Sequence, residues 1–132
     1  MRQIGEGSQR HQDAISWFKT LPVFLDLEGL RAIHACWHAP SIQILSDCLD
    51  DNAYFTNAGF VASHRKGSAF YEAVKVLLKG PEISLDEGVY FFDKDGKKRT
   101  EARIRWWNKD ISNLKSAIIG IGSASSDLID RQ

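Results

Sequence analysis

The chain has 132 residues, of which 43% are hydrophobic and 26% are charged, a composition typical of one modest globular domain. Lysine and arginine total 17, as do aspartate and glutamate, so the formal net charge is zero and we predict no nucleic-acid groove and no membrane contact. No apolar run approaches the ~20 residues of a membrane helix, and residues 1–13 lack the apolar core of a signal peptide. The only two cysteines, Cys36 and Cys48, do not form a disulfide framework, which favours a cytoplasmic chain with reduced thiols.

The first predicted element is a helix in the segment DAISWFKTL, residues 13–21. Its apolar residues recur at helical spacing, and they are Ala14, Trp17, Phe18 and Leu21. Pro22 ends this pattern, because proline cannot continue a helix. The spacing therefore indicates a helix that leads into a strand.

Two short apolar runs, VFLDL and LRAIHA, follow that helix. Glu28 and Gly29 separate them, and a two-residue connection of this kind closes an antiparallel hairpin. We expect both strands of this hairpin to be largely buried.

Two further helices are predicted in the middle of the chain. Pro40 and Ser41 begin the first, and Ser68 caps the second, which Gly80 and Pro81 stop. The apolar face of the first consists of Ile42, Leu45, Cys48 and Leu49. The apolar stripe of the second consists of Phe70, Tyr71, Val74, Leu77 and Leu78. Residues 50–67 between them lack a clean period and are interpreted as a surface excursion.

A second hairpin is predicted from VYFF, a turn that begins at Asp93, and the run KKRTEARIRWW. The turn is not a calcium loop, because Ile104 stands where such a loop has its glutamate. Strand alternation is expected to send Trp106 and Trp107 to opposite faces, so we interpret them as packing residues and not as a base-stacking platform. No element is assigned to the tail, residues 108–132.

Together these elements predict an α/β or α+β chain with two antiparallel hairpins and about three helices. Neither hairpin has an evident partner strand, so the core is expected to be incomplete. We therefore interpret residues 1–132 as a single partial domain.

Potential metal ligands gather where the second strand runs out into a loop. His34, Cys36 and His38 would point to the same side if the strand geometry continued, and Cys48 follows on the next helix. A small private zinc site is one interpretation, although the close ligand pairs of zinc motifs are not matched here. The other interpretation is that His34 ends a buried strand and hydrogen-bonds to the backbone.

The segment WFKTLPVFLDLEGLRAIHACW resembles calcineurin-like metallophosphoesterases, in which a helix, a Leu-Pro pair and two strands lead to a histidine at a strand end. The likeness continues through VLLKGPEISLDEGVYFFDKDGKKRTEARIRWW and covers most of residues 13–107. It points to bacterial members of the serine/threonine-phosphatase-like or dinucleoside-tetraphosphatase-like kind. The family usually has two glycines after its histidine, whereas Ala35 and Cys36 stand here. The resemblance implies a partial calcineurin-like β-sandwich with flanking helices.

The chemistry that this resemblance implies is hydrolysis of phosphate esters or anhydrides, in a phosphoprotein or nucleotide substrate, at two divalent ions of manganese, iron, zinc or magnesium. His34 would bind one of these ions. The family's other ligands come from an Asp-x-His pair, Gly-Asp-x-x-Asp-Arg-Gly and Gly-Asn-His-Glu loops, and a Gly-His pair, none of which occurs in this sequence. The resemblance therefore implies a middle-to-C-terminal fragment that is inactive alone.

Four residues are candidates for binding the substrate. Lys79, Arg103 and Arg105 supply cations, and guanidinium groups match phosphate oxygens in pairs. His38 is the fourth candidate. The alternative for any one of the three cations is a solvated hairpin face on which Glu101 neutralises its neighbours.

Two hypotheses about the whole chain stay open. In the first, it is an excised, truncated or frame-disrupted product of a complete enzyme. In the second, it is a non-enzymatic binding module that docks a companion chain, or another copy of itself, through exposed apolar strands. Neighbouring reading frames discriminate between them, because a frame that carries the absent loops favours a split or broken enzyme.

Overall fold

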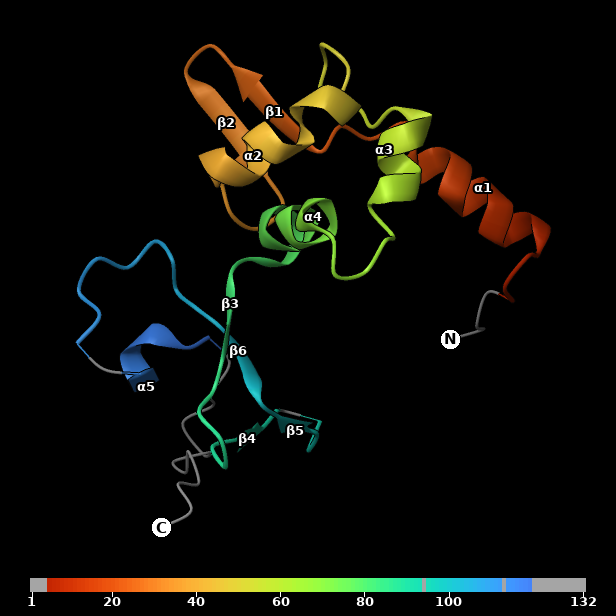
Figure 1. Cartoon of the computed structure of the whole chain (residues 1–132). Coiled ribbons are helices and arrows are strands. Elements are labelled where there is room, and N and C mark those ends of the chain that lie inside the picture. The colour runs from red at the N-terminus through yellow and green to blue at the C-terminus, as the bar shows by residue number, and fades with distance from the viewer. Residues whose placement is uncertain (1–4, 94, 113, 120–132) are drawn as a thin grey trace. The chain divides into compact units, whose positions relative to one another are not determined.

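The computed structural model describes residues 5–93, 95–112 and 114–119 (Figure 1). The chain consists of two compact units, Met1–Leu78 and Lys79–Gln132. The mixed α+β class predicted from the sequence is confirmed, with helices and three two-stranded antiparallel sheets among the described residues. That these units make one partial domain stays a prediction. No helix in the described ranges has the length and apolar character needed to cross a bilayer.

Unit 1 is mainly helical. It contains α1 (Gln9–Phe18), β1 (Phe24–Leu27), β2 (Leu30–Ile33), α2 (Ala39–Leu45), the 3-10 turn η1 (Ser46–Cys48), α3 (Asn57–Ala62) and α4 (Ala69–Lys79), whose last residue belongs to unit 2. The helices predicted near residues 13, 41 and 68 correspond to α1, α2 and α4, while α3 lies in the stretch interpreted as a surface excursion.

Side-chain caps set where three of these helices begin. Ser68 Oγ accepts from the Tyr71 N–H at 3.1 Å, which confirms the cap predicted for α4. Ser8 Oγ accepts from the His11 N–H at 3.3 Å, so α1 begins four residues before the predicted segment. Thr56 Oγ1 accepts from the Gly59 N–H at 3.1 Å and starts α3, the helix that periodicity alone missed.

The core of unit 1 lies where α2 and α4 meet the entry to β1. Val23, Leu45, Ala73 and Leu77 are buried there, and Leu45 and Leu77 have no exposed surface. Partly buried apolar residues surround this cluster, namely Phe24, Ile33, Ile42, Leu49, Phe55, Phe70 and Val74. Full burial of a leucine side chain stabilises a fold by about 1.5–3 kcal/mol, so this small cluster is the main source of stability in the unit.

The hairpin of β1 and β2 is confirmed, but the expectation that its strands are largely buried is wrong. Gly29 has φ of 75°, as the predicted tight turn requires, and Leu27 pairs with Leu30 across it. One face carries Phe24 and Ile33, which pack on the core. The other face is wholly apolar yet exposed, and it consists of Leu25, Leu27, Leu30 and Ala32. An apolar sequence does not bury a strand when no described element covers that face.

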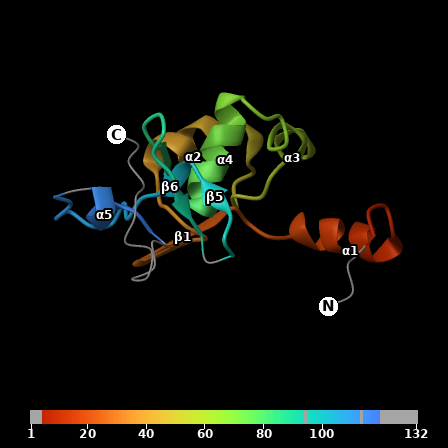
Figure 2. The ribbon, with the colours of Figure 1, turned by 90° about the horizontal axis from the view of Figure 1, so that it is seen from below.

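Helix α1 also exposes apolar surface. None of its residues is buried, and Trp17 and Phe18 are 58% and 54% exposed. Figure 2 shows α1 extending away from the other helices of unit 1. The helix is therefore held mainly by its own capping and hydrogen bonds.

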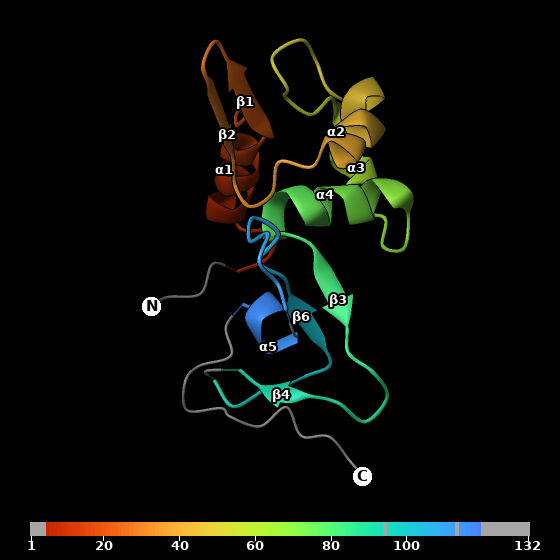
Figure 3. The ribbon, with the colours of Figure 1, turned by 90° about the vertical axis from the view of Figure 1, so that its left-hand side faces the viewer.

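Unit 2 is a small antiparallel assembly. It contains β3 (Glu82–Ser84), β4 (Phe91–Phe92), β5 (Lys98–Arg99), β6 (Glu101–Arg103) and α5 (Leu114–Ala117). Strand β4 pairs with β5 (Figure 1), and β3 pairs with β6, which lie side by side in Figure 3. Phe91, Ala102 and Ile118 form its buried core.

The second hairpin is present but shorter than predicted, because the run KKRTEARIRWW does not form one strand. Thr100 separates it into two strands. Strand β5 pairs with β4 in the hairpin, and β6 pairs with β3. Beyond Arg103 the chain turns toward α5, where the Arg105 N–H donates to the Ala117 carbonyl at 2.7 Å. The long strand is lost because its second half gains a different partner.

The expectation that Trp106 and Trp107 point to opposite faces is also wrong. The Asn108 N–H donates to the Arg105 carbonyl at 2.9 Å, which makes this segment a turn and not a strand. The two indole rings meet edge to face with centroids 5.6 Å apart. Both are exposed, so they do not fill a core in this unit.

Candidate functional site

His34 follows directly after β2, at a bend that α4 helps to fix. The Ala35 and Cys36 N–H groups both donate to the Leu77 carbonyl, at 3.1 and 3.4 Å. This carbonyl lies in the last turn of α4, and the residue four positions later is Pro81, which has no N–H to offer. The proline that ends α4 thus leaves an acceptor that anchors the bend beside His34.

The imidazole of His34 is exposed and makes no hydrogen bond or ion pair with any described residue. The other three histidines all use Nδ1 locally. His11 accepts from Gly7 at 3.1 Å, His38 contacts Ser41, and His64 lies 2.9 Å from the Phe60 carbonyl. His34 therefore does not show the buried, backbone-bonded arrangement that was its alternative interpretation, and both of its ring nitrogens are open to a ligand.

The four residues of the suggested zinc site do not converge. Strand geometry ends at Ile33, so His34, Cys36 and His38 do not continue its alternation. Cys36 is 4% exposed, and its burial raises the pKa of the thiol and disfavours the thiolate that metals bind. Across the described part of the chain, no group of three or more histidine, cysteine, aspartate or glutamate side chains is placed to hold a metal ion. The residues present do not fit a complete metal centre.

His38 caps helix α2. Its Nδ1 accepts from the Ser41 N–H at 3.3 Å and lies 2.8 Å from the Ser41 hydroxyl, which is buried. An acceptor at Nδ1 leaves the proton of the neutral ring on Nε2. The structure thus gives His38 a capping role, and its role in substrate binding stays a prediction.

The described part of unit 2 contains a hollow with a volume of about 670 Å³. Charged side chains dominate its lining, which consists of Lys79, Glu82, Phe91, Asp93, Lys98, Arg99, Thr100, Glu101, Arg103 and Ile119. Two of the predicted substrate-binding cations, Lys79 and Arg103, therefore share one surface. Arg105 is exposed but does not line the hollow.

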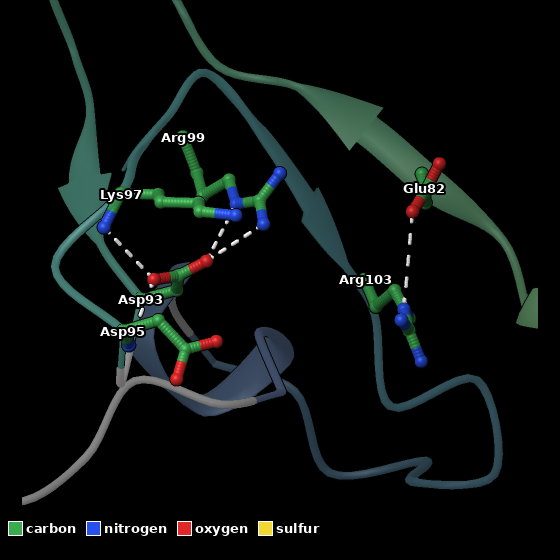
Figure 4. Close-up of polar contacts among 6 residues, drawn as sticks. All are labelled: Glu82, Asp93, Asp95, Lys97, Arg99 and Arg103. Atoms are coloured by element: carbon green, nitrogen blue, oxygen red, sulfur yellow. Dashed lines mark hydrogen bonds and ion pairs between the residues drawn. The ribbon is translucent and has the colours of Figure 1, made fainter. Parts of the chain in front are cut away.

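Asp93 organises one wall of this hollow (Figure 4). Its Oδ1 accepts from the Asp95 and Lys97 N–H groups, each at 2.9 Å. Its Oδ2 accepts from Arg99, at 2.8 Å from Nε and 2.7 Å from Nη2. The Lys97 hydrogen bond, followed by the Arg99 guanidinium, lowers the pKa of this carboxyl below its usual range. Both oxygens thus close the turn, in agreement with its interpretation as a turn and not a calcium loop.

Arg99 and Lys98 are site candidates that the sequence did not single out. The Asp93–Arg99 contact has a sequence signal, because Asp93 precedes Arg99 by six residues across a turn. The contact could be predicted only with the register of β4 against β5, in which Phe91 pairs with Arg99.

Comparisons with known proteins give this chain no assignment, since no family model, no curated protein and no solved structure matches it significantly.

Proposed function

We propose that this chain is part of a metal-dependent phosphoesterase, to which it supplies His34 as a metal ligand. The other ligands would come from a companion polypeptide segment, because the described residues hold no cluster that fits a metal centre. When bound, the metal pair of such enzymes polarises a phosphoryl group and activates water. We also propose a cytoplasmic setting, which two free cysteines favour.

The observation that carries this proposal is the exposed imidazole of His34, free of partners among the described residues, on a bend held by two backbone hydrogen bonds. A ligand to a shared metal needs an anchored backbone and an uncommitted ring nitrogen, and His34 has both. The sequence around it also resembles the metallophosphoesterase segment in which a strand-end histidine binds metal. Other histidines of the chain lack this combination, since their Nδ1 atoms have local partners.

A co-expression experiment tests this role. A reading frame near this gene that carries the absent aspartate, histidine and asparagine loops is expressed together with the chain, and manganese-dependent hydrolysis of p-nitrophenyl phosphate is measured. We expect His34→Ala to reduce the rate by at least about 100-fold, because even residues that only orient metal ligands contribute about 10–100-fold.

His64→Ala is the matched control, because this exposed ring lies just after α3 and contacts the Phe60 carbonyl of that helix. It should leave the rate within a factor of about two. An active pair whose rate is the same with His34→Ala would contradict the proposal, as would a genome with no such neighbouring frame.

A second function, that of a binding module without catalysis, is favoured by the exposed face of the first hairpin. Leu25, Leu27 and Leu30 are 42%, 55% and 58% exposed on that face. Within the described residues β1 and β2 pair only with each other, so the outer edge of each strand is open. A two-stranded sheet gains stability when further strands cover its apolar face. Another copy of this chain, or a companion chain, would provide that cover.

Sedimentation velocity distinguishes these occupants. If copies of the chain pair through this face, Leu27→Lys should shift the population to monomer, while Val61→Lys on the exposed side of α3 should not. A chain that is monomeric at all concentrations excludes self-pairing and leaves the companion chain as the occupant. Equal effects of the two substitutions would contradict a specific role for the hairpin face.

A further inference from the structure

The hollow of unit 2 carries an inference that does not depend on His34 or on a metal. Four cationic side chains line it, Lys79, Lys98, Arg99 and Arg103, against three carboxylates, Glu82, Asp93 and Glu101. Cations are therefore in excess on this surface, although the whole chain has a formal net charge of zero. Local excess charge of this kind favours an anionic ligand.

Arg99 is the best-positioned donor of the four. Asp93 holds its Nε and Nη2, and the backbone N–H groups of Asp95 and Lys97 hold Asp93 in turn. Those N–H groups already compensate part of the carboxylate charge, so the Arg99 guanidinium is fixed in place without being fully neutralised. Its Nη1 has no partner among the described residues and is available to a ligand.

Arg103 is aligned more loosely. Its Nε lies 3.8 Å from Glu82 Oε1, across the β3–β6 pair in which these residues face each other. This distance is longer than a hydrogen bond, so the ion pair orients the guanidinium while most of its N–H donors stay free. Figure 4 shows Arg99 and Arg103, which lie on the consecutive strands β5 and β6.

The two lysines add charge without a carboxylate partner in the described residues. Lys98 Nζ lies 4.0 Å from the centre of the Tyr90 ring, a contact that holds the ammonium but does not neutralise it. Lys79 ends α4 and is exposed. Both can move toward an anion at little cost, because no ion pair must be broken first.

We propose that this hollow binds a phosphate group, carried by a small phosphorylated molecule. Planar guanidinium forks match the tetrahedral oxygens of phosphate, and Arg99 and Arg103 offer two of them. A volume of about 670 Å³ exceeds the need of a free ion and falls within the usual range of small-molecule sites. Of the four predicted substrate-binding residues the hollow includes Lys79 and Arg103, adds Arg99 and Lys98, and leaves out Arg105 and His38.

Amide-detected NMR of the ¹⁵N-labelled full chain tests the proposal with orthophosphate, pyrophosphate and acetate, each at constant ionic strength. Orthophosphate or pyrophosphate should produce saturable shifts in the amides of residues 98–103 and in the Arg99 Nε–H signal. The ligand that binds with the higher affinity shows whether the site prefers a single phosphate or a diphosphate. Acetate should produce a clearly smaller response, because a carboxylate uses fewer donors.

The matched variants are Arg99→Gln, Lys79→Gln and Lys109→Gln. Arg99→Gln should weaken binding about tenfold or more, as expected for the loss of a charge-assisted hydrogen bond. Since Arg99 also contacts the Asp93 turn, Lys79→Gln gives a second test at a position outside it, with an expected loss of about three- to tenfold. Lys109→Gln, an exposed lysine of the same unit that does not line the hollow, should have no effect.

Three results would overturn this assignment. They are the absence of saturable shifts up to about 20 mM of either phosphate, an equal response to acetate, and an equal loss of affinity in Lys109→Gln and Lys79→Gln. Metal binding at His34 does not enter any of these measurements, so this site and the proposed function fail independently.

Discussion

At the scale of single residues, Asp93 shows how one carboxylate can close a hairpin. It accepts three hydrogen bonds, two of them from the backbone of its own turn, and it also forms an ion pair with Arg99 Nη2. A charged acceptor suits this position because the Lys97 N–H and the Arg99 guanidinium both favour the ionised form. The hairpin turn and the orientation of Arg99 therefore both depend on the ionised carboxylate of Asp93.

This dependence predicts a specific response to acid. Because the pKa of Asp93 is lowered in the folded chain, its stabilisation of the hairpin is complete above the ordinary value of about 3.9 and is lost as the pH falls through the lowered folded pKa. Exchange protection of the Lys97 amide should fall in that range. Asp93→Asn should remove this pH dependence, whereas Asp95→Asn in the same turn should retain it. Protection in the wild type that does not change with acid would contradict the role given to Asp93.

The two thiols are expected to differ in reactivity. Cys36 is buried with a raised pKa, while Cys48 is partly exposed. Since the thiolate is the reactive form, iodoacetamide should modify Cys48 first, and mass spectrometry of Cys36→Ser and Cys48→Ser assigns each site. Zinc that protected both thiols together would contradict the lack of a metal-holding group among the described residues and would revive the private zinc site.

At the scale of elements, α3 depends on close approach to η1. A Cβ built on Gly59 would lie 2.5 Å from the Cys48 carbonyl oxygen and 2.9 Å from Cys48 Cβ. Real atoms do not approach so closely, so α3 would have to move away. The same carbonyl accepts the Thr56 N–H at 3.0 Å, which joins the start of α3 to η1.

Gly59→Ala should therefore destabilise unit 1 by about 1–3 kcal/mol, although alanine favours a helix over glycine by about 1 kcal/mol. Urea unfolding followed by circular dichroism measures the change. Gly5→Ala is the control, because nothing lies within 4 Å of its added Cβ. A stabilised Gly59→Ala variant would show that helix propensity outweighs the contact with η1.

Elements set by local signals were predictable, and elements set by distant partners were not. Helix α4 has its predicted cap and Gly-Pro stop, and most of its predicted apolar stripe packs inward, although Leu78 is exposed and Ala73 is buried instead. The exposure of β1 and β2 could not be predicted, because burial depends on what covers a strand and not on its own residues. The run KKRTEARIRWW forms two short strands, β5 paired with β4 and β6 paired with β3. Its own residues do not predict this division, because it depends on the partner strands.

The candidate sites were likewise predictable from sequence only where local signals define them. His34 at a strand end could be located from sequence, but its lack of partners among the described residues was visible only in the structure. Lys79 and Arg103 were both predicted as substrate-binding cations, but only the structure, with β3 paired to β6, shows them lining one hollow. Arg105 follows that strand by two residues and is left outside the hollow.

At the scale of the whole molecule, each unit has a small core, and unit 1 has a large exposed apolar area. The exposed apolar side chains of unit 1 include Trp17, Phe18, Leu21, Leu25, Leu27, Leu30, Ile44, Val61 and Leu78. Proteins that act alone rarely leave so many large apolar side chains exposed, and such surface marks sites of association. The apolar hairpin face and His34, the proposed metal ligand, lie in the same unit, so one companion segment could cover the face and supply the other ligands.

We propose that this chain supplies one metal ligand, His34, and does not hold a metal centre by itself. Calorimetric titration of manganese into the purified full chain, beside His34→Ala, tests this proposal. We predict no saturable binding at micromolar metal for either protein, because a single imidazole cannot hold a divalent ion against water without further converging ligands. Micromolar binding by the wild type that is lost with His34→Ala would contradict the claim, since it would show that this chain alone assembles the site.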